Sequence, residues 1–110
     1  CMNETALVKL ILHYLKMQQI FAWRNNSGAV MMGGNRYVKF GINGMADVIG
    51  ICGERFLAIE AKVGKGKQSE DQIKFQQNVE SNGGIYILAY SLDDVIEGLK
   101  SHHPQNINPQ

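Results

Sequence analysis

The fold is decided by the stretch Gly44-Met45-Ala46-Asp47-Val48-Ile49-Gly50-Ile51-Cys52-Gly53-Glu54-Arg55-Phe56-Leu57-Ala58-Ile59-Glu60-Ala61-Lys62, which is typical of two short apolar strands around a tight turn. Gly53-Glu54 suits a type II′ turn, because that turn needs a positive φ at its first central residue. With these two residues at the turn, the antiparallel register pairs Asp47 with Glu60. The two acidic side chains are then direct neighbours, with side-chain carbons about 5 Å apart.

Side chains alternate along a strand, so Glu60 and Lys62 point to the same face as Asp47. Two carboxylates and an ammonium therefore gather at one end of an otherwise apolar hairpin. Buried like charges are costly, and a divalent cation between the carboxylates removes that cost. Oxygen ligands favour a hard ion such as Mg²⁺, with Mn²⁺ as a substitute. The alternative is a strand-end acid beside an exposed Glu60–Lys62 salt bridge of little energetic value, but the apolar flanks and the register favour the metal site.

The chain has 110 residues, 45% of them hydrophobic and 19% charged, which indicates one globular domain of ordinary size. Its net charge of +1 means that any nucleic-acid-binding surface must be local. Cys1 and Cys52 provide neither a disulfide framework nor a CxxC metal pair, so we expect a reducing cytoplasm. We expect no membrane association, because no apolar run has membrane-spanning length and no signal peptide is recognisable.

The remaining elements follow from hydrophobic periodicity and turn signals. They are a helix from Asn3 to Gln18 capped by Asn3, a strand at 20–24, a turn at 25–28, a glycine-rich loop at 31–35, an edge strand at 36–40, a helix capped by Ser69 that runs through Asn82, a strand at 85–89 and a last helix capped by Ser91. The strand–helix–strand segment from 56 to 89 implies a right-handed crossover with parallel flanking strands. We therefore predict an α/β fold of order α-β-β-β-α-β-α, with a small mixed sheet flanked by helices. Residues 1–100 form its single domain and residues 101–110 a flexible tail.

Several polar side chains near this hairpin suit nucleic-acid binding. Arg24, Asn25 and Ser27 form a compact set of hydrogen-bond donors of the kind that grips phosphate or sugar, although a polar turn explains them as well. Lys65 and Lys67 lie on a mobile glycine loop after the hairpin. Beside a metal site they would attract a polyanion, and otherwise they belong to a solvated basic loop.

Three further residues each allow a structural and a functional interpretation. Glu4, in the first helical turn, is favoured there by the helix dipole, or it points inward as a third carboxylate. Gln72 completes a capping box with Ser69, and its place near the site also allows it to bind a ligand or to orient Lys62. Trp23 can stack on a base, but a core or interface position is favoured for this aromatic.

The ordered set of Asp47, then Glu60-Ala61-Lys62, then Gln72 after a lysine–glycine loop resembles the PD-(D/E)xK nuclease superfamily. More narrowly, the chain is similar to the virus-type replication–repair nuclease domain, VRR-NUC. The similarity extends from about Trp23 to Leu99 and includes Trp23-Arg24-Asn25-Asn26-Ser27-Gly28, Gly44-x-x-Asp47, Glu60-x-Lys62, Ser69-x-x-Gln72 and Gly83-Gly84. Ala46 stands where the superfamily name has proline. Small residues are familiar at that position, and the proline ligates nothing.

This resemblance implies a restriction-endonuclease-like core and a Mg²⁺- or Mn²⁺-dependent endonuclease. The stand-alone members it resembles are phage-encoded homodimers that cut branched DNA such as four-way (Holliday) junctions, which implies a bacterial or phage-infected cytoplasm. The implied metal ligands are Asp47, Glu60, the backbone carbonyl of Ala61 and, from the first helix, Glu4. The implied catalytic set adds Lys62 and Gln72, and the implied DNA contacts are Arg24, Asn25, Ser27, Lys65 and Lys67.

Two other function classes are open from the sequence. A nucleic-acid-binding module of this fold would keep DNA affinity with a weak or silent site, which the intact acidic and basic residues of the site argue against. A structural or assembly protein would use a methionine-rich loop containing Met31, Met32 and Met45 as an interface. That third class predicts neither DNA affinity nor metal dependence.

Overall fold

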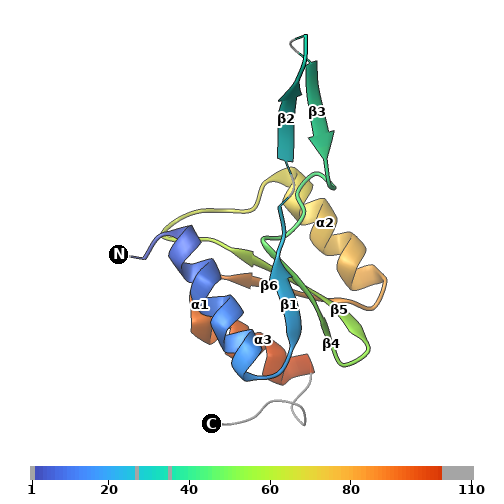
Figure 1. Ribbon diagram of the computed structural model, residues 1–110. Coiled ribbons are helices and arrows are strands. Elements are labelled where there is room, and N and C mark those ends of the chain that lie inside the picture. The colour runs from blue at the N-terminus through green and yellow to red at the C-terminus, as the bar shows by residue number, and fades with distance from the viewer. Residues whose placement is uncertain (1, 27, 35, 103–110) are drawn as a thin grey trace.

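The computed structural model describes residues 2–26, 28–34 and 36–102, and these form an α/β fold (Figure 1). Within them, one four-stranded mixed sheet is packed between three helices, as the sequence predicts. The elements in chain order are α1 (Glu4–Met17), β1 (Phe21–Arg24), β2 (Gly28–Met32), β3 (Arg36–Phe40), β4 (Val48–Cys52), β5 (Arg55–Ala61), α2 (Glu70–Ser81), β6 (Ile85–Ala89) and α3 (Leu92–His102).

The four-stranded sheet has the strand order β1-β4-β5-β6. The β4–β5 hairpin is antiparallel, and Val48 pairs with Ile59, which is the register that the sequence predicts. Gly53 has a φ of 63°, as the first central position of the predicted turn requires. β6 joins β5 in parallel, with α2 in the connection, so the predicted parallel pairing is also confirmed.

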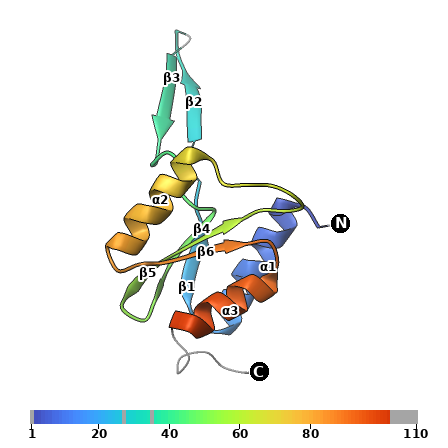
Figure 2. The same ribbon diagram turned by 180° about the vertical axis from the view of Figure 1, so that it is seen from behind.

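Two apolar clusters fix the helices on opposite faces of this sheet (Figure 2). α1 and α3 cover one face, where Leu7 and Leu99 are buried in one apolar cluster with Ile59 of β5. α2 covers part of the other face through Phe75 and Val79, the inner stripe that its sequence predicts. The second cluster contains, besides these two residues, Ala46, Ile49, Ala58 and Tyr86.

The helix boundaries follow the capping signals in the sequence. Asn3 caps α1, and its Oδ1 accepts a hydrogen bond from the Ala6 N–H at 2.8 Å. Ser69 and Gln72 form the predicted capping box at the start of α2. α3 runs to His102, so the first two residues assigned to the tail are helical, and residues 103–110 lie outside the described part of the chain. Among the described helices, none is long and apolar enough to cross a membrane.

The predicted strand at 36–40 is confirmed as β3, but the sequence prediction missed β2 and the separate sheet that the two strands form. These strands pair with each other, with Gly28 opposite Phe40, and form a separate two-stranded sheet. In Figure 1 this hairpin projects away from the four-stranded sheet. Residues 36–40 are therefore not an edge strand of the main sheet, and the order is α-β-β-β-β-β-α-β-α. β2 was not recognisable because its residues are apolar after a glycine and lack the period-two alternation of a half-buried strand.

Gly44 holds the loop before β4 against the start of α2. Its φ is 76°, and a Cβ at this position would overlap the backbone C and O atoms of Asp71. Ala46, two residues further on, is fully buried in the cluster beneath α2. The glycine therefore permits a backbone-to-backbone contact that sets the first turn of α2 next to Asp47.

We expect Gly44→Ala to lower the free energy of unfolding by about 3 kcal/mol, because left-handed backbone costs about 1–2 kcal/mol and the overlap adds about 1–3 kcal/mol. Gly83→Ala is the matched control, since Gly83 has a φ of 86° but a Cβ there meets no atom within 4 Å. The control should lose only about 1–2 kcal/mol. Denaturant unfolding of both variants measures the difference, and equal losses would show that the Gly44 contact contributes nothing.

Candidate active site

The end of the β4–β5 hairpin brings Asp47 and Glu60 together. Asp47 directly precedes β4, and its Oδ2 accepts a hydrogen bond from the Ala61 N–H at 2.8 Å. On its other side, the Asn25 N–H donates to the backbone carbonyl of Asp47 at 2.8 Å. Continuing the β4–β5 register by one step puts Asp47 opposite Glu60, as the sequence predicts. Backbone contacts from β1 and β5 thus hold the two acids at the same end of the sheet.

The carboxylate of Glu60 is buried, with only 3% of the residue exposed. Its Oε2 accepts a hydrogen bond from Gln72 Nε2 at 3.0 Å and lies 3.7 Å from Lys62 Nζ. Its Oε1 has no hydrogen-bond partner among the described residues. A buried polar atom without a partner costs about 1–3 kcal/mol, and more when the group is charged. With Glu60 ionised, this oxygen therefore indicates an interaction that the described side chains do not supply, whereas protonated Glu60 can hydrogen-bond to the Asp47 side chain.

Burial raises the pKa of Glu60 to about 7, and the negative charge of Asp47 adds to this shift. A hydrogen bond with the Asp47 side chain and the charge of Glu4 act on the Glu60 pKa in the same direction, whereas Lys62 lowers it. Glu60 therefore does not ionise readily near neutral pH beside the charge of Asp47 unless a cation compensates it.

The oxygen atoms at this point fit a hard divalent cation. In a strand, the N–H and C=O groups of one residue point to the same neighbouring strand. Because the Ala61 N–H donates to Asp47, the Ala61 carbonyl also points toward Asp47. This carbonyl, the Asp47 carboxylate and the unpartnered Oε1 of Glu60 are the donor types that Mg²⁺ and Mn²⁺ prefer. Among residues 2–26, 28–34 and 36–102, no group of three or more His, Cys, Asp or Glu side chains could hold a metal. Such a site would therefore need backbone oxygen and water as well.

Glu4 does not join Asp47 and Glu60 in a three-carboxylate group. It is the first residue of α1, and it is exposed. Its charge nevertheless acts on the site, because it contributes to the raised pKa of Glu60. The helix dipole explains an acid at this capped N-terminus, and metal ligation by Glu4 stays a prediction.

Gln72 serves both the helix cap and the site. Its Oε1 accepts a hydrogen bond from the Ser69 N–H at 2.8 Å, which completes the capping box. Its Nε2 donates to Glu60, so the residue that it orients is Glu60 and not Lys62. The Lys62 side chain is itself 14% exposed, which places its ammonium at the boundary between the buried carboxylate and solvent.

The predicted donor set at the end of β1 is divided between the two faces of the sheet. Arg24 and Asn25 are consecutive, so their side chains point to opposite faces of the sheet. Asn25 lies on the same face as Asp47. Arg24 is exposed. Ser27 lies outside the described residues.

The loop between β5 and α2 carries Lys65 and Lys67, both of them exposed. The sequence predicts this loop to be mobile, but hydrogen bonds tie it down. The Gly66 N–H donates to the Val63 carbonyl at 3.0 Å, and the Tyr90 hydroxyl donates to the Gly66 carbonyl at 2.7 Å. The two lysines therefore extend from a backbone that is fixed near the site.

Sequence reasoning missed a polar contact that fixes the end of this loop. Gln68 Nε2 donates to Gln76 Oε1 at 2.9 Å and to the Tyr86 hydroxyl at 3.2 Å. Burial raises the pKa of Tyr86 to about 12, so the hydroxyl is neutral at ordinary pH. No local motif signals this contact, because its three residues come from a loop, a helix and a strand. Only the alternation along β6, which places Tyr86 on the face covered by α2, pointed toward it.

The buried Glu60 carboxyl predicts that the metal-free protein loses stability as the pH rises. The folded state binds the Glu60 proton more tightly than the unfolded state does, so the stabilisation is complete below about pH 4.5 and is lost as the pH rises through about 7. We expect the free energy of unfolding to fall by about 2–3 kcal/mol across this range. Glu60→Gln keeps the shape and an acceptor for Gln72, so it should flatten the profile and be the more stable protein above about pH 7.

Urea unfolding in EDTA across this pH range measures the two profiles. Glu97→Gln removes an exposed carboxylate of α3 and controls for the change in net charge. A Glu60→Gln profile with the same slope as that of the wild type would mean that burial does not disturb the Glu60 carboxyl.

Comparison with known proteins assigns no family and no function to this site. No family model matches the chain, and no curated protein matches it. The chemistry of the site therefore rests on its own atoms, which are two adjacent carboxylates, an unpartnered oxygen, an ammonium and an amide donor at one end of the sheet.

Proposed function

We propose that this chain is a metal-dependent endodeoxyribonuclease of the PD-(D/E)xK type, similar to VRR-NUC domains, that hydrolyses phosphodiester bonds in branched DNA such as four-way junctions. The observation that carries the proposal is the buried Glu60 carboxylate, whose Oε2 contacts Gln72 and Lys62 while its Oε1 has no partner among the described residues. An exposed salt bridge, the alternative from the sequence, does not fit side chains that are 14% and 4% exposed.

Asp47, Glu60 and the Ala61 carbonyl would hold the cation. When bound, Mg²⁺ supplies charge neutralisation at the phosphate and a lowered pKa for a bound water. Gln72 keeps Oε2 of Glu60 engaged, which leaves Oε1 for the metal. The ammonium of Lys62 orients the attacking water, assists its deprotonation or offsets negative charge in the transition state.

The exposed basic residues support contacts to the DNA backbone. Arg24, Lys65 and Lys67 suit phosphate contacts, which fix the position of a duplex and carry no sequence information. The preference for branched DNA and the homodimer come from the family resemblance. A dimer would present two sites, one for each strand of a symmetric junction, and light scattering of the wild-type protein tests for it.

We expect the wild-type protein to cut a labelled four-way junction with Mg²⁺ or Mn²⁺ and to leave it intact in EDTA. Lys62→Ala should lose at least about 100-fold in rate, because a positioned proton-transfer group contributes about 10²–10⁴-fold. Lys100→Ala is the matched control, since Lys100 is exposed on α3 and pairs with Glu97 at 3.8 Å. Gel assays with junction, flap, duplex and single-stranded DNA measure both the rates and the preferred substrate.

The other outcomes separate the remaining function classes. Tight junction binding without cutting under either metal would favour a nucleic-acid-binding module. Neither binding nor cutting would remove the nuclease proposal and favour a structural or assembly role. Equal rate losses in Lys62→Ala and Lys100→Ala would mean that Lys62 acts only through the net charge of the protein.

A further inference from the structure

The sheet face that carries Glu60 is only half covered by α2. Phe75 and Val79 of α2 pack in the cluster that includes positions of β4, β5 and β6. Toward β1 and the β4–β5 turn the same face is exposed, and it carries four large apolar side chains that we call the aromatic platform: Phe21, Trp23, Ile51 and Phe56. Phe21 is 69% exposed and Trp23 is 44% exposed, so Trp23 is not a core residue.

The residues of the aromatic platform are neighbours in the strand register. Phe21 pairs with Ile51 across β1 and β4, and Ile51 pairs with Phe56 across β4 and β5, so these three form one row. Trp23 is the next residue of β1 on this face. Its ring centroid lies 5.2 Å from that of Phe21, with the ring planes tilted by 51°. The two rings therefore form one continuous apolar surface.

This surface leads directly to the candidate active site. Asn25 follows Trp23 on the same side of the chain, and its N–H donates to the backbone carbonyl of Asp47. Side chains two residues apart on a strand are separated by about 6.7 Å, so Asn25, Trp23 and Phe21 follow one another along this face. A DNA strand with a phosphate at Asp47 and Glu60 would thus carry its following bases over Trp23 and then Phe21.

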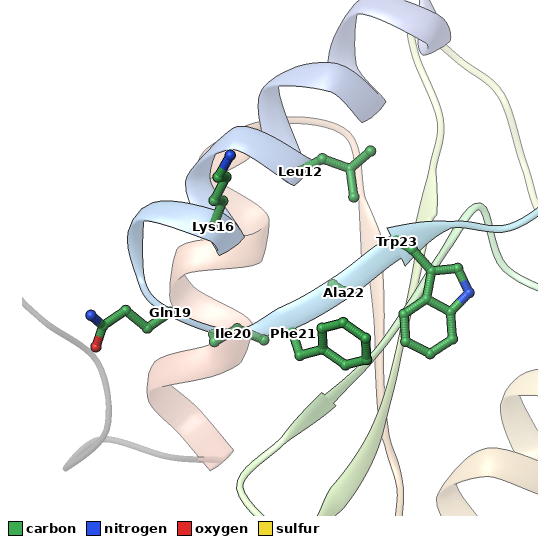
Figure 3. A pocket seen from close by; sticks show the side chains of 7 residues that line it. All are labelled: Leu12, Lys16, Gln19, Ile20, Phe21, Ala22 and Trp23. Atoms are coloured by element: carbon green, nitrogen blue, oxygen red, sulfur yellow. The ribbon is translucent and has the colours of Figure 1, made fainter.

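A hollow of about 510 Å³ lies along the outer edge of β1 beside these rings (Figure 3). Phe21 and Trp23 line it from the strand, and Leu12 and Lys16 line it from α1. In Figure 3 the two rings project to the same side of β1. The lining also includes Lys16, whose ammonium lies apart from the two rings in Figure 3. The exposed aromatic faces suit the flat base of a nucleotide.

We propose that the aromatic platform is a stacking site for unpaired bases of the DNA strand that enters the candidate active site. This inference rests on the proposed nuclease function and narrows its substrate to branched DNA with unpaired nucleotides beside the bond that is cut, such as a flap, because a four-way junction can pair all of its bases. Bases in a duplex are already stacked on one another, whereas unpaired bases at a branch point or in a single strand offer their faces to aromatic side chains. A second copy of the chain could also cover an apolar face, but it would not require the platform to lie in line with two carboxylates.

The chain has one tryptophan, so the fluorescence of Trp23 reports on this site directly. Oligothymidine added in EDTA should quench Trp23, because a stacked base contacts the indole. An abasic oligonucleotide of the same length carries the same phosphates and should leave the emission unchanged. Because DNA is not cut in EDTA, this measurement does not depend on catalysis.

Variants that remove one ring test the same site by anisotropy of a labelled oligothymidine. Phe21→Leu and Trp23→Leu keep an apolar side chain and should each weaken binding by about 5- to 100-fold, whereas Trp23→Phe keeps a ring and should restore most of the affinity. Met17→Ala is the matched control, since it removes an exposed apolar side chain of α1 outside the platform. Circular dichroism and denaturant midpoints verify that all four variants fold.

Each remaining outcome overturns one specific statement. Equal binding of abasic and base-bearing strands, or ring variants that bind like the wild type, would overturn the stacking site. Trp23 emission that shifts with protein concentration in the absence of DNA, together with a dimer mass that Phe21→Leu abolishes, would assign the platform to a second copy of the chain instead. If the protein cuts the junction in Mg²⁺ but Trp23 is not quenched, only the stacking site is overturned. If Trp23 is quenched by base-bearing DNA but nothing is cut, only the nuclease proposal is overturned.

Discussion

A carboxylate inside a sheet must find compensation, and Glu60 is buried on β5, which has a strand on each side. Its backbone cannot move toward solvent unless both strand ladders open. Gln72 and Lys62 compensate only one of its oxygens, and the other faces no partner among the described residues. This arrangement destabilises the metal-free fold, since a neutral side chain of the same shape would avoid the cost. Such an unfavourable buried acid beside a second acid is typical of residues retained for chemistry.

The position of α2 depends on the same carboxylate. One end of the Gln72 amide closes the capping box and the other end donates to Glu60, so the start of the helix is bonded to the site. Gly44 allows the loop before Asp47 to touch the same helical turn at backbone distance. A shift of α2 would therefore break the loop contact and the support of Glu60 together. The geometry of the site is thus set by three backbone segments and not by the flexible side chains at its rim.

The sequence predicts those parts of the site whose geometry follows from local rules of turns and strands. Gly53 restricts the turn, and the two-residue period of a strand then determines every facing pair up to Asp47 and Glu60. β3 was predicted as a strand from its alternating residues, but β2 was missed because its residues after Gly28 are all apolar and show no period-two alternation. The Gln72–Glu60 bond and the unpartnered oxygen also could not be predicted. They depend on how α2 packs across the sheet, which no spacing along the chain encodes.

The uncovered strip beside α2 follows from the number of helices that pack on each face. A helix is about 10 Å wide and neighbouring strands are about 4.8 Å apart, so one helix covers about two strands. α1 and α3 share one face of the four-stranded sheet, whereas α2 alone packs on the other. The exposure near β1 is therefore a consequence of the topology, but the residue types are not. Polar side chains on an uncovered strip would carry less risk of aggregation than exposed rings do. Phe21 and Trp23 are nevertheless exposed there, on the strand that leads to the two carboxylates. A ligand with flat apolar faces explains these rings better than folding stability does.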